Sequence, residues 1–190
     1  MKPDWNDIYD PRQVYCPEAD TYLLLEIAIK EIRPGDRVLE IGTGSGYIAA
    51  GLKEVADVIA TDINPHATYA AKQKGLEVVR TDLARGLRGP FDLVIFNPPY
   101  LPTLDEEKID DWLEYALDGG VNGREVVERS ASEIRSVLAA EGRVLLLISS
   151  LTGIDATLDI FEGAGYRVEI LERRPVYDED LLVLKCVINC

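Results

Sequence analysis

Short apolar runs alternate along the chain with longer segments in which apolar residues recur every three or four positions. The longer spacing is typical of helices with one buried face, and short runs rich in Val, Ile and Leu are typical of buried strands. The pattern predicts helices at Asp20–Ile32, Tyr47–Val55, Pro65–Lys74, Gly123–Ala139 and Ile154–Ala164, and strands at Arg37–Ile41, Val58–Thr61, Val78–Thr81, Leu93–Phe96, Arg143–Ile148, Tyr166–Arg173 and Leu181–Ile188. Strands that alternate with helices predict a doubly wound α/β sheet that is mostly parallel.

The last two predicted strands depart from this alternation. Residues 174–180 join them, and this connection is too short for a crossover helix, so we expect an antiparallel pair. A seven-stranded, mostly parallel sheet with an antiparallel C-terminal strand pair resembles the Rossmann-like fold of class I S-adenosylmethionine-dependent methyltransferases. The length of 190 residues matches one domain. We therefore expect residues 1–190 to form a single methyltransferase domain, with residues 1–35 as an N-terminal segment and helix that cover the cofactor site.

Composition and charge narrow the range of partners. The formal net charge is −14, and because phosphate binding depends on clustered Lys and Arg, neither nucleic acid nor an anionic membrane is an expected partner. The longest apolar runs, such as Val144–Ile148, are far shorter than the roughly 20 residues that span a bilayer. No secretory apolar stretch follows Met1, so a cytoplasmic protein is expected. Cys16, Cys186 and Cys190 suggest neither a disulfide framework nor a zinc site, and no bound metal is expected.

A glycine-rich turn, Gly42–Gly46, follows the first predicted strand and precedes a helix. Gly42, Gly44 and Gly46 allow positive φ angles and a close approach of a ligand to the backbone. The carboxylate of Glu40, just before the turn, would repel the pyrophosphate of a dinucleotide and attract the ammonium group of S-adenosylmethionine. The turn therefore favours S-adenosylmethionine as cofactor, although nicotinamide sites and simple packing turns use similar glycines.

Two acidic residues end the next two predicted strands. Asp62 stands where a carboxylate accepts hydrogen bonds from both ribose hydroxyls in doubly wound folds. It could instead cap the helix that opens at Pro65, a role for which Asn64 competes. Asp82 is placed to accept a hydrogen bond from the adenine amino group while Leu83 covers the ring, unless Asp82 only caps a turn.

The sharpest signal is the segment Asn97-Pro98-Pro99-Tyr100. It directly follows the fourth predicted strand and therefore lies at the carboxyl edge, where open α/β sheets bind ligands. Two consecutive prolines cannot continue a strand, and they hold their carbonyls rigidly. The Asn97 side-chain oxygen and the Pro98 backbone oxygen can each accept one hydrogen of a substrate NH2 group. Tyr100 can stack on the planar group that carries it.

Such a grip suits methylation of a planar nitrogen. The lone pair of an amide or an aromatic amine is delocalised and therefore a poor nucleophile toward the methyl group of a sulfonium. Two accepted hydrogen bonds oppose this delocalisation and aim the nitrogen at the methyl group. A strong base is not required, and we expect His66, the only histidine, to lie on an exposed helix surface without a catalytic role.

With these residues in view, the sequence resembles the release-factor glutamine N5-methyltransferases, in particular the short archaeal and eukaryotic branch that lacks an N-terminal substrate domain. The resemblance covers nearly the whole chain. It rests on the glycine turn, on Asn97–Tyr100 and on four further motifs, which are Val14–Thr21, Thr61–Pro65, Thr81–Leu83 and Gly119–Glu125. It implies that the cofactor is contacted by Thr21, Glu40, Gly42, Asp62, Asp82, Leu83 and Asn97.

The resemblance also implies a substrate and a partner. The substrate is the glutamine of the Gly-Gly-Gln loop in a class I translation termination factor, with its side-chain amide held by Asn97 and Pro98. The partner is a small activator protein, often zinc-binding, that adds a strand beside the third strand near Leu76–Arg80 and so protects an exposed apolar edge.

Two features depart from the family's pattern. Cys16 replaces a residue that is often acidic, and the loop Leu101–Asp111 is unusually acidic, with Asp105, Glu106, Glu107, Asp110 and Asp111.

Other functions stay open at this point. An adenine N6-methyltransferase would present the same planar NH2 group, but the acidic composition and the short chain leave little provision for phosphate anchors or a target-recognition domain. A protein lysine methyltransferase would need a proton acceptor more than a grip on NH2. A noncatalytic partner-binding subunit would lack tight cofactor binding. Gly119–Glu125 fits a structural turn as well as a substrate contact, and the acidic loop fits a solvated surface as well as a docking site for a basic protein.

Overall fold

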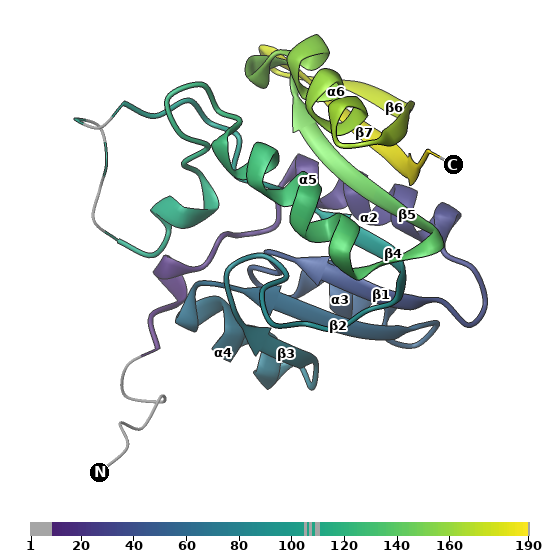
Figure 1. Cartoon of the computed structure of the whole chain (residues 1–190). Helices are drawn as coiled ribbons and strands as arrows, with labels where there is room; N and C mark the ends of the chain where they lie inside the picture. The colour runs from purple at the N-terminus through teal and green to yellow at the C-terminus, as the bar shows by residue number, and fades with distance from the viewer. Residues whose placement is uncertain (1–8, 105, 107, 109–110, 190) are drawn as a thin grey trace.

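The computed structural model describes residues 9–189 except 105, 107, 109 and 110, and these form one sheet between two layers of helices (Figure 1). The strands are β1 Arg37–Ile41, β2 Asp57–Asp62, β3 Glu77–Arg80, β4 Phe91–Phe96, β5 Leu138–Ser149, β6 Tyr166–Val176 and β7 Glu179–Ile188. Their order across the seven-stranded sheet is β3-β2-β1-β4-β5-β7-β6. The pairs from β3 to β5 are parallel, whereas β7 runs antiparallel to both β5 and β6.

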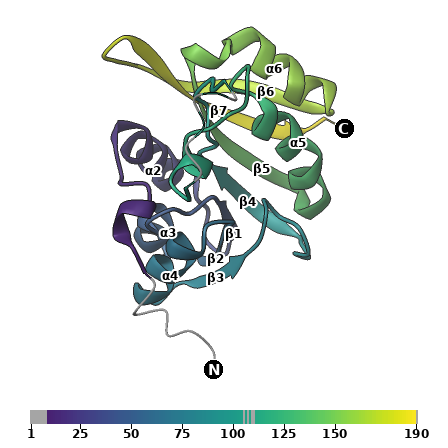
Figure 2. The same cartoon turned by 90° about the vertical axis from the view of Figure 1, so that its left-hand side faces the viewer.

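Helices cover both faces of the sheet (Figure 2). The α-helices are α2 Ala19–Glu31, α3 Tyr47–Leu52, α4 Pro65–Gln73, α5 Glu125–Val137 and α6 Ile154–Gly163, and the short 3-10 helices are η1 Pro11–Gln13, η3 Glu114–Ala116 and η4 Ser150–Thr152. One face packs against α2, α3 and α4, and the other against α5 and α6. Because the central strands are buried on both faces, Leu93–Phe96 and Val144–Ile148 are continuous apolar runs rather than alternating ones.

The predicted fold class is confirmed, since the mostly parallel order and the C-terminal antiparallel pair are both present. The predicted boundaries fail at the junction of α5 and β5. The sequence pattern predicts a helix to Ala139 and a strand from Arg143, whereas α5 ends at Val137 and β5 begins at Leu138. Leu138 has an extended backbone and pairs with Phe91 at an irregularity in the register of β4. This tertiary pairing overrides the local helix propensity.

The strand order places four loops side by side. Because β3, β2, β1 and β4 are parallel neighbours, their carboxyl ends lie at one edge of the sheet. Asp62 ends β2, whereas Asp82, the glycine turn and Asn97 follow β3, β1 and β4 in that order. The chain order reverses between β1 and β4, and in doubly wound folds this reversal opens a crevice in which ligands bind.

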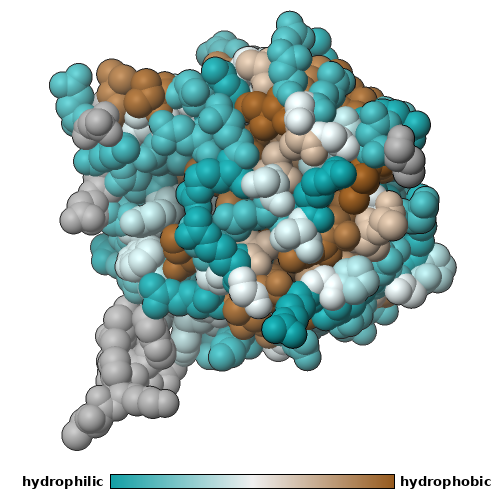
Figure 3. Space-filling view, viewed as in Figure 1, coloured by the Kyte–Doolittle hydropathy of each residue, from teal (hydrophilic) through white to brown (hydrophobic). Residues whose placement is uncertain are grey.

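Polar residues predominate on one face of the molecule. Figure 3 shows a face covered mainly by hydrophilic residues, with smaller apolar areas between them. The full sequence holds 34 acidic and 20 basic residues, so the chain as a whole carries a net negative charge. Within the described ranges, no helix has both the length and the apolar character needed to cross a membrane.

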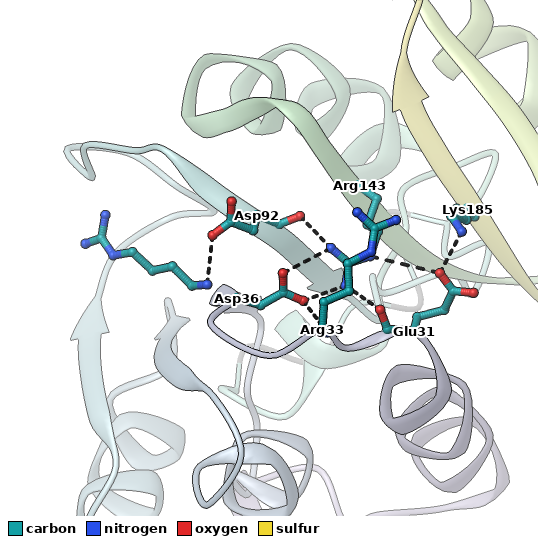
Figure 4. A network of polar contacts seen from close by, with 7 residues as sticks. Glu31, Arg33, Asp36, Asp92, Arg143 and Lys185 are labelled. Carbon is teal, nitrogen blue, oxygen red and sulfur yellow. Dashed lines mark hydrogen bonds and ion pairs between the residues drawn. The ribbon is translucent and has the colours of Figure 1, made fainter.

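A buried arginine joins several elements near the amino ends of the central strands (Figure 4). Arg143 of β5 is 1% exposed, and its guanidinium donates to Asp36 Oδ2 at 2.5 Å, to the Asp92 carbonyl at 3.1 Å and to the Glu31 carbonyl. Lys185 of β7 also pairs with Glu31, at 2.7 Å. One side chain thereby ties the end of α2 and the turn before β1 to β4 and β5.

Arg143 and Asp36 form a charged pair. Burial favours the neutral form of the Asp36 carboxyl, but hydrogen bonds from Arg143 and from the Arg33 N–H outweigh burial and hold the pKa of Asp36 below its ordinary value. Removing one member of such a pair leaves the other charge buried without a partner, which costs more than the pair itself contributes.

We expect Arg143→Met to lower the free energy of unfolding by about 3–5 kcal/mol, because the substitution strands the Asp36 carboxylate. Arg173→Met is the matched control, since Arg173 pairs with Asp180 on the exposed hairpin of β6 and β7. Its loss should stay below about 1 kcal/mol. Urea unfolding of both variants measures the difference, and small, equal losses would contradict a structural role for the buried pair.

Candidate active site

A cavity of about 660 Å³ opens at the carboxyl edge of the sheet. This volume is within the range of small-molecule and cofactor sites. The lining comes mainly from residues between 11 and 21, residues 42–45 of the glycine turn, the carboxyl ends of β1, β2 and β4, residues 81–83 after β3, residues 97–101 after β4, residues between 112 and 117, and Val126, Arg129 and Glu179. Residues of the N-terminal segment and of the start of α2, including the buried Thr21, line this cavity, and residues 1–8 are outside the described part. That they cover a bound cofactor stays a prediction.

The glycine turn adopts the backbone that its spacing predicts. Gly42, Gly44 and Gly46 have φ angles of 67°, 53° and 75°. Gly42 and Gly44 line the cavity, but Gly46 does not. A Cβ at Gly46 would lie 2.8 Å from Leu76 and 3.2 Å from Ala71, so this glycine allows the start of α3 to approach α4. The structure therefore assigns Gly46 to helix packing rather than to the predicted cofactor contact.

Glu40 is a buried carboxyl group at the end of β1, 3% exposed. Its Oε2 accepts hydrogen bonds from Thr43 Oγ1 at 2.5 Å and from the Ala49 N–H at 3.1 Å. Burial raises the pKa of Glu40 to about 8, against these hydrogen bonds, and the nearby Asp62 carboxylate adds to the rise. A cation bound beside Glu40 would stabilise the charged form, so the site suits the ammonium group of S-adenosylmethionine.

Asp62 ties the glycine turn to the end of β2. Its Oδ2 accepts from the Gly44 N–H and its Oδ1 from the Asn64 N–H, both at 2.8 Å. Burial raises the pKa of Asp62, against these hydrogen bonds. Asn64 is the residue that caps α4, with its Oδ1 accepting from the His66 N–H at 2.8 Å and the Ala67 N–H at 3.4 Å. The capping alternative for Asp62 is therefore wrong, and its carboxylate lies in the cavity wall where the ribose anchor is predicted.

Asp82 and Leu83 follow β3 and line the cavity. Asp82 Oδ2 pairs with Arg129 of α5 and, at 3.1 Å, with Arg85. Two arginines thus hold one oxygen of the carboxylate that is predicted to accept the adenine amino group. Leu83 has a φ angle of 52°, which is uncommon for a residue with a Cβ, and strained backbone of this kind concentrates at ligand sites.

Asn97 has one satisfied and one unsatisfied end. Its Nδ2 donates to Asp20 Oδ2 at 2.9 Å. Its Oδ1 is buried and accepts no hydrogen bond from the residues that the structure describes. Buried polar atoms are nearly always paired in native proteins. Three side-chain atoms of the described residues are buried without a hydrogen-bond partner, Asn97 Oδ1, Glu133 Oε2 and Arg143 Nε, and of these residues only Asn97 lines the cavity, where a ligand could supply the donor. Pro98 and Pro99 line the same wall.

Tyr100 is held in place by the turn Gly119–Glu125. The Gly119 N–H donates to the Leu101 carbonyl at 2.9 Å, and a Cβ at Gly123 would lie 2.6 Å from the Tyr100 carbonyl oxygen. The turn therefore braces the chain just beyond the motif, which favours the structural alternative for Gly119–Glu125. Burial raises the pKa of Tyr100, so its ring presents an uncharged face to the cavity.

Sequence reasoning missed several residues of this site. They are Asp20, Tyr15, Arg129, Trp112 and Glu179, all of which line the cavity. Asp20 and Tyr15 fall within the motif Val14–Thr21, so a signal was present without a role attached to it. The other three belong to elements that reach the cavity only through the tertiary fold, as when the Trp112 N–H donates to Gln13 Oε1 at 2.8 Å.

The expectation of an exposed His66 is wrong. His66 is 8% exposed, and its Nδ1 accepts a hydrogen bond from the Asp10 N–H at 3.1 Å. The N-terminal segment folds back over α4 and covers this face of the helix, which no local pattern indicates. His66 does not line the cavity.

The acidic loop Leu101–Asp111 is described only in part. Asp105, Glu107 and Asp110 lie outside the described residues, as does Cys190. Cys16 is exposed beside the cavity and Cys186 is buried. No group of His, Cys, Asp and Glu suited to a metal ion occurs in the part of the chain that the structure describes.

The buried Glu40 predicts a pH dependence. Between its ordinary pKa of 4.5 and about 8, folded Glu40 holds a proton that the unfolded chain has released. The unfolded state then binds fewer protons, so the free energy of unfolding of the cofactor-free protein falls as the pH rises through this window. Glu40→Gln should flatten the fall in urea unfolding at several pH values, while Glu169→Gln on the exposed face of β6 should not. The pKa of Asp62 is raised as well, so part of the dependence of unfolding free energy on pH should persist in Glu40→Gln. A dependence on pH that is the same in Glu40→Gln as in the wild-type protein would contradict the assignment of the bound proton to Glu40.

Comparison with known proteins agrees with this geometry. Residues 16–111 match the methyltransferase small domain family. A Methanocaldococcus jannaschii protein, provisionally named as a protein N5-glutamine methyltransferase, is 39% identical over 180 residues, which cover 90% of each chain. The release factor glutamine methyltransferase of Deinococcus radiodurans is 35% identical over 169 residues, which cover 81% of this chain and 60% of that one. The structure of the E. cuniculi Mtq2–Trm112 complex, described as responsible for methylation of the eRF1 translation termination factor, matches 93% of this chain and 99% of that chain with a TM-score of 0.79 and 30% identity.

These matches confirm the family resemblance that the motifs indicate. They extend over most of the chain, and they include the whole segment from Cys16 to beyond Tyr100 in which most of the cavity lining lies. The chain therefore belongs to the release factor glutamine methyltransferase family of S-adenosylmethionine-dependent enzymes.

Proposed function

We propose that this protein transfers the methyl group of S-adenosylmethionine to the side-chain amide nitrogen of the glutamine in the Gly-Gly-Gln loop of a class I translation termination factor, in the cytoplasm. The observation that carries the proposal is the buried Asn97 Oδ1, an acceptor without a partner among the described residues. A primary amide supplies the N–H donor that this oxygen lacks. The relatives named for release factor and eRF1 methylation support the choice of the protein that carries the amide.

The residues around the cavity fit S-adenosylmethionine. Glu40 would face the ammonium group, Asp62 the ribose hydroxyls, and Asp82 with Leu83 the adenine, while Gly42 and Gly44 leave the backbone open to the ligand. Thr21 would contribute from the first turn of α2. When bound, the cofactor supplies an electrophilic methyl group on a cationic sulfur. The remaining tasks, which are orientation and activation of the acceptor nitrogen, fall to the protein.

The chemical difficulty lies in the amide nitrogen, because its lone pair is delocalised onto the neighbouring carbonyl. Asn97 Oδ1 and the Pro98 carbonyl oxygen would each accept one N–H of the substrate amide. Together they localise the lone pair and hold the nitrogen in line with the methyl group, which is catalysis by position and by charge placement. Tyr100 would stack on the planar amide from the side of the cavity wall. The nitrogen loses one proton after the transfer.

Adenine would present a similar NH2 group, so the substrate class needs a further argument. Duplex or single-stranded nucleic acid brings a dense row of phosphates, and a protein with a net charge of −14 repels it. A lysine side chain brings an ammonium group that has no lone pair until a base removes its proton, and two acceptor oxygens do not perform that step. Glutamine on a protein is therefore the acceptor that the site favours.

The exposed edge at β3 supports a protein partner. β3 is an outer strand of the sheet, and Val79 is 41% exposed on it. A second cavity of about 280 Å³ lies beside this edge, lined by α4 residues with Val78 and Arg80 of β3. A strand added by the partner would form hydrogen bonds with the unpaired backbone N–H and C=O groups of β3, and an apolar side chain of the partner would fill the cavity. We infer a small activator protein at β3, of the kind that accompanies Mtq2 in the similar complex, with zinc in that partner rather than in this chain.

The first test uses labelled S-adenosylmethionine with either the termination factor or duplex DNA. The wild-type protein, with its activator, should label the factor at the Gly-Gly-Gln glutamine. Asn97→Ala should lower methyl transfer by at least ~10²-fold, because it removes an acceptor that acts mainly on the transition state. Cofactor affinity, measured by calorimetry, should fall by less than about 10-fold.

The control variant is Asn189→Ala, which changes an exposed asparagine that does not line the cavity and should alter neither quantity. Label in DNA without label in the factor would refute the proposed substrate. Equal losses of transfer and of cofactor affinity in Asn97→Ala would mean that Asn97 chiefly holds the cofactor.

The edge strand gives a separate prediction. Val79→Lys places a charge on the open edge and should weaken binding of the activator by at least ~10-fold, while the thermal unfolding midpoint of the chain alone stays unchanged. Ile170→Lys is the matched control, because Ile170 is 47% exposed on β6 at the opposite edge of the same sheet. Titration calorimetry with the activator measures both. A greater loss for Ile170→Lys would move the partner to the other edge.

A further inference from the structure

The side chain of Asn97 has two ends of nearly equal shape and opposite hydrogen-bonding character. The oxygen end accepts hydrogen bonds, and the NH2 end donates them. Only the oxygen end can hold a substrate NH2 group, so the proposed grip requires one of the two flipped orientations of the amide. Something in the protein must select that orientation.

Asp20 is the residue that faces the NH2 end. It lies in the first turn of α2, is 4% exposed and lines the cavity. Its Oδ2 accepts from Asn97 Nδ2 at 2.9 Å and from the Tyr15 hydroxyl at 3.0 Å. Its Oδ1 accepts from the Thr21 N–H at 2.5 Å and from Thr21 Oγ1 at 3.1 Å. Each of these groups is a donor, and an ionised carboxylate offers acceptors alone.

We propose that Asp20, supported by Tyr15, is a positioning residue that fixes the Asn97 amide with Nδ2 turned toward α2 and Oδ1 turned toward the substrate. The inference deepens the proposed glutamine methylation and rests on it. Through this contact Asp20 determines that the site accepts a substrate nitrogen with hydrogens to donate. A group that can only accept hydrogen bonds, such as a glutamate carboxylate at the same place, would find no donor on Asn97.

The flipped orientation is disfavoured by electrostatics. It would place Asn97 Oδ1 against Asp20 Oδ2 at the distance now spanned by the hydrogen bond, 2.9 Å. Two oxygens at this distance in a buried site repel each other with little screening by water. Tyr15 cannot relieve the repulsion, because its hydroxyl already donates to the same Asp20 oxygen. Burial raises the pKa of Tyr15, so this donor keeps its proton.

Two other roles for Asp20 make different predictions. Its charge could act on the cationic sulfur of the cofactor, or its Oδ1 contact with the Thr21 N–H could simply stabilise the start of α2. Exchanging the two side chains separates these roles from positioning. An amide at position 20 must keep its oxygen on the Thr21 N–H, so its NH2 group faces position 97.

The exchange experiment compares four proteins with the activator present. Asp20→Asn alone places the NH2 group of residue 20 against the NH2 group of Asn97, and Asn97→Asp alone places two carboxylates against each other. Each single variant should therefore lose at least ~10²-fold in kcat on the termination factor. In the double variant Asp20→Asn/Asn97→Asp, the NH2 group at position 20 donates to the carboxylate at position 97. The second oxygen of that carboxylate is left to accept a hydrogen bond from the substrate. Its kcat should recover to within about 10-fold of the wild-type value. Cofactor affinity from calorimetry should change by less than about 10-fold across the series.

Losses that multiply in the double variant would overturn the inference. A charge effect on the cofactor would leave Asn97→Asp active, because that variant keeps the Asp20 carboxylate, and a role in starting α2 would leave Asp20→Asn active, because the amide oxygen stays on the Thr21 N–H. A wild-type protein that leaves the glutamine unmethylated would instead refute the proposed function, before any variant is considered. The two failures are therefore distinct.

A second measurement needs no variant to fold. In the ¹⁵N-labelled wild-type protein without ligands, the Asn97 NH2 protons should exchange slowly with water and show nuclear Overhauser contacts to the Tyr15 ring, because both groups meet at Asp20 Oδ2. Rapid exchange without such contacts would mean that the NH2 end faces the cavity, and the proposed orientation would be wrong.

Discussion

Four neighbouring parallel strands that end at one edge of the sheet are the constraint on which this molecule depends. Because these strands run in the same direction, the chain leaves all four of them at the same edge. The residues after β3, β2, β1 and β4 therefore lie close together, although they are far apart along the chain. Glu40, Asp62, Asp82 and Asn97 consequently face one cavity. The order reversal between β1 and β4 leaves the space that a ligand needs.

Stability and function occupy opposite ends of the same strands. Near their amino ends, Arg143 joins Asp36, Asp92 and Glu31 in a buried network of hydrogen bonds and ion pairs. Near their carboxyl ends, burial raises the pKa of Glu40 to about 8, and Asn97 Oδ1 has no partner among the described residues. Both features cost stability, because one disfavours a charged carboxylate and the other leaves a buried acceptor unpaired. A fold that supports them must draw its stability from elsewhere, and the buried network and the two apolar faces of the sheet supply it.

The parts of the site that follow a strand directly could be predicted from the sequence, because the end of an apolar run marks their position. This holds for Asp62, Asp82 and Asn97–Tyr100. Contacts between distant segments could not be predicted. Asp20 and Asn97 are 77 positions apart, and Gly46 looks like a ligand glycine until Leu76 and Ala71 are seen against it. His66 illustrates the same limit, since the segment that buries it comes from the start of the chain.

The central claim is that Asn97 Oδ1 accepts a hydrogen from the substrate amide. A crystal structure of the protein with its activator, S-adenosylhomocysteine and a peptide containing Gly-Gly-Gln tests it most directly. We expect the glutamine amide nitrogen to lie about 2.7–3.2 Å from Asn97 Oδ1, with its second hydrogen on the Pro98 carbonyl. A glutamine seated elsewhere, or Asn97 Oδ1 bonded only to the cofactor, would contradict the claim.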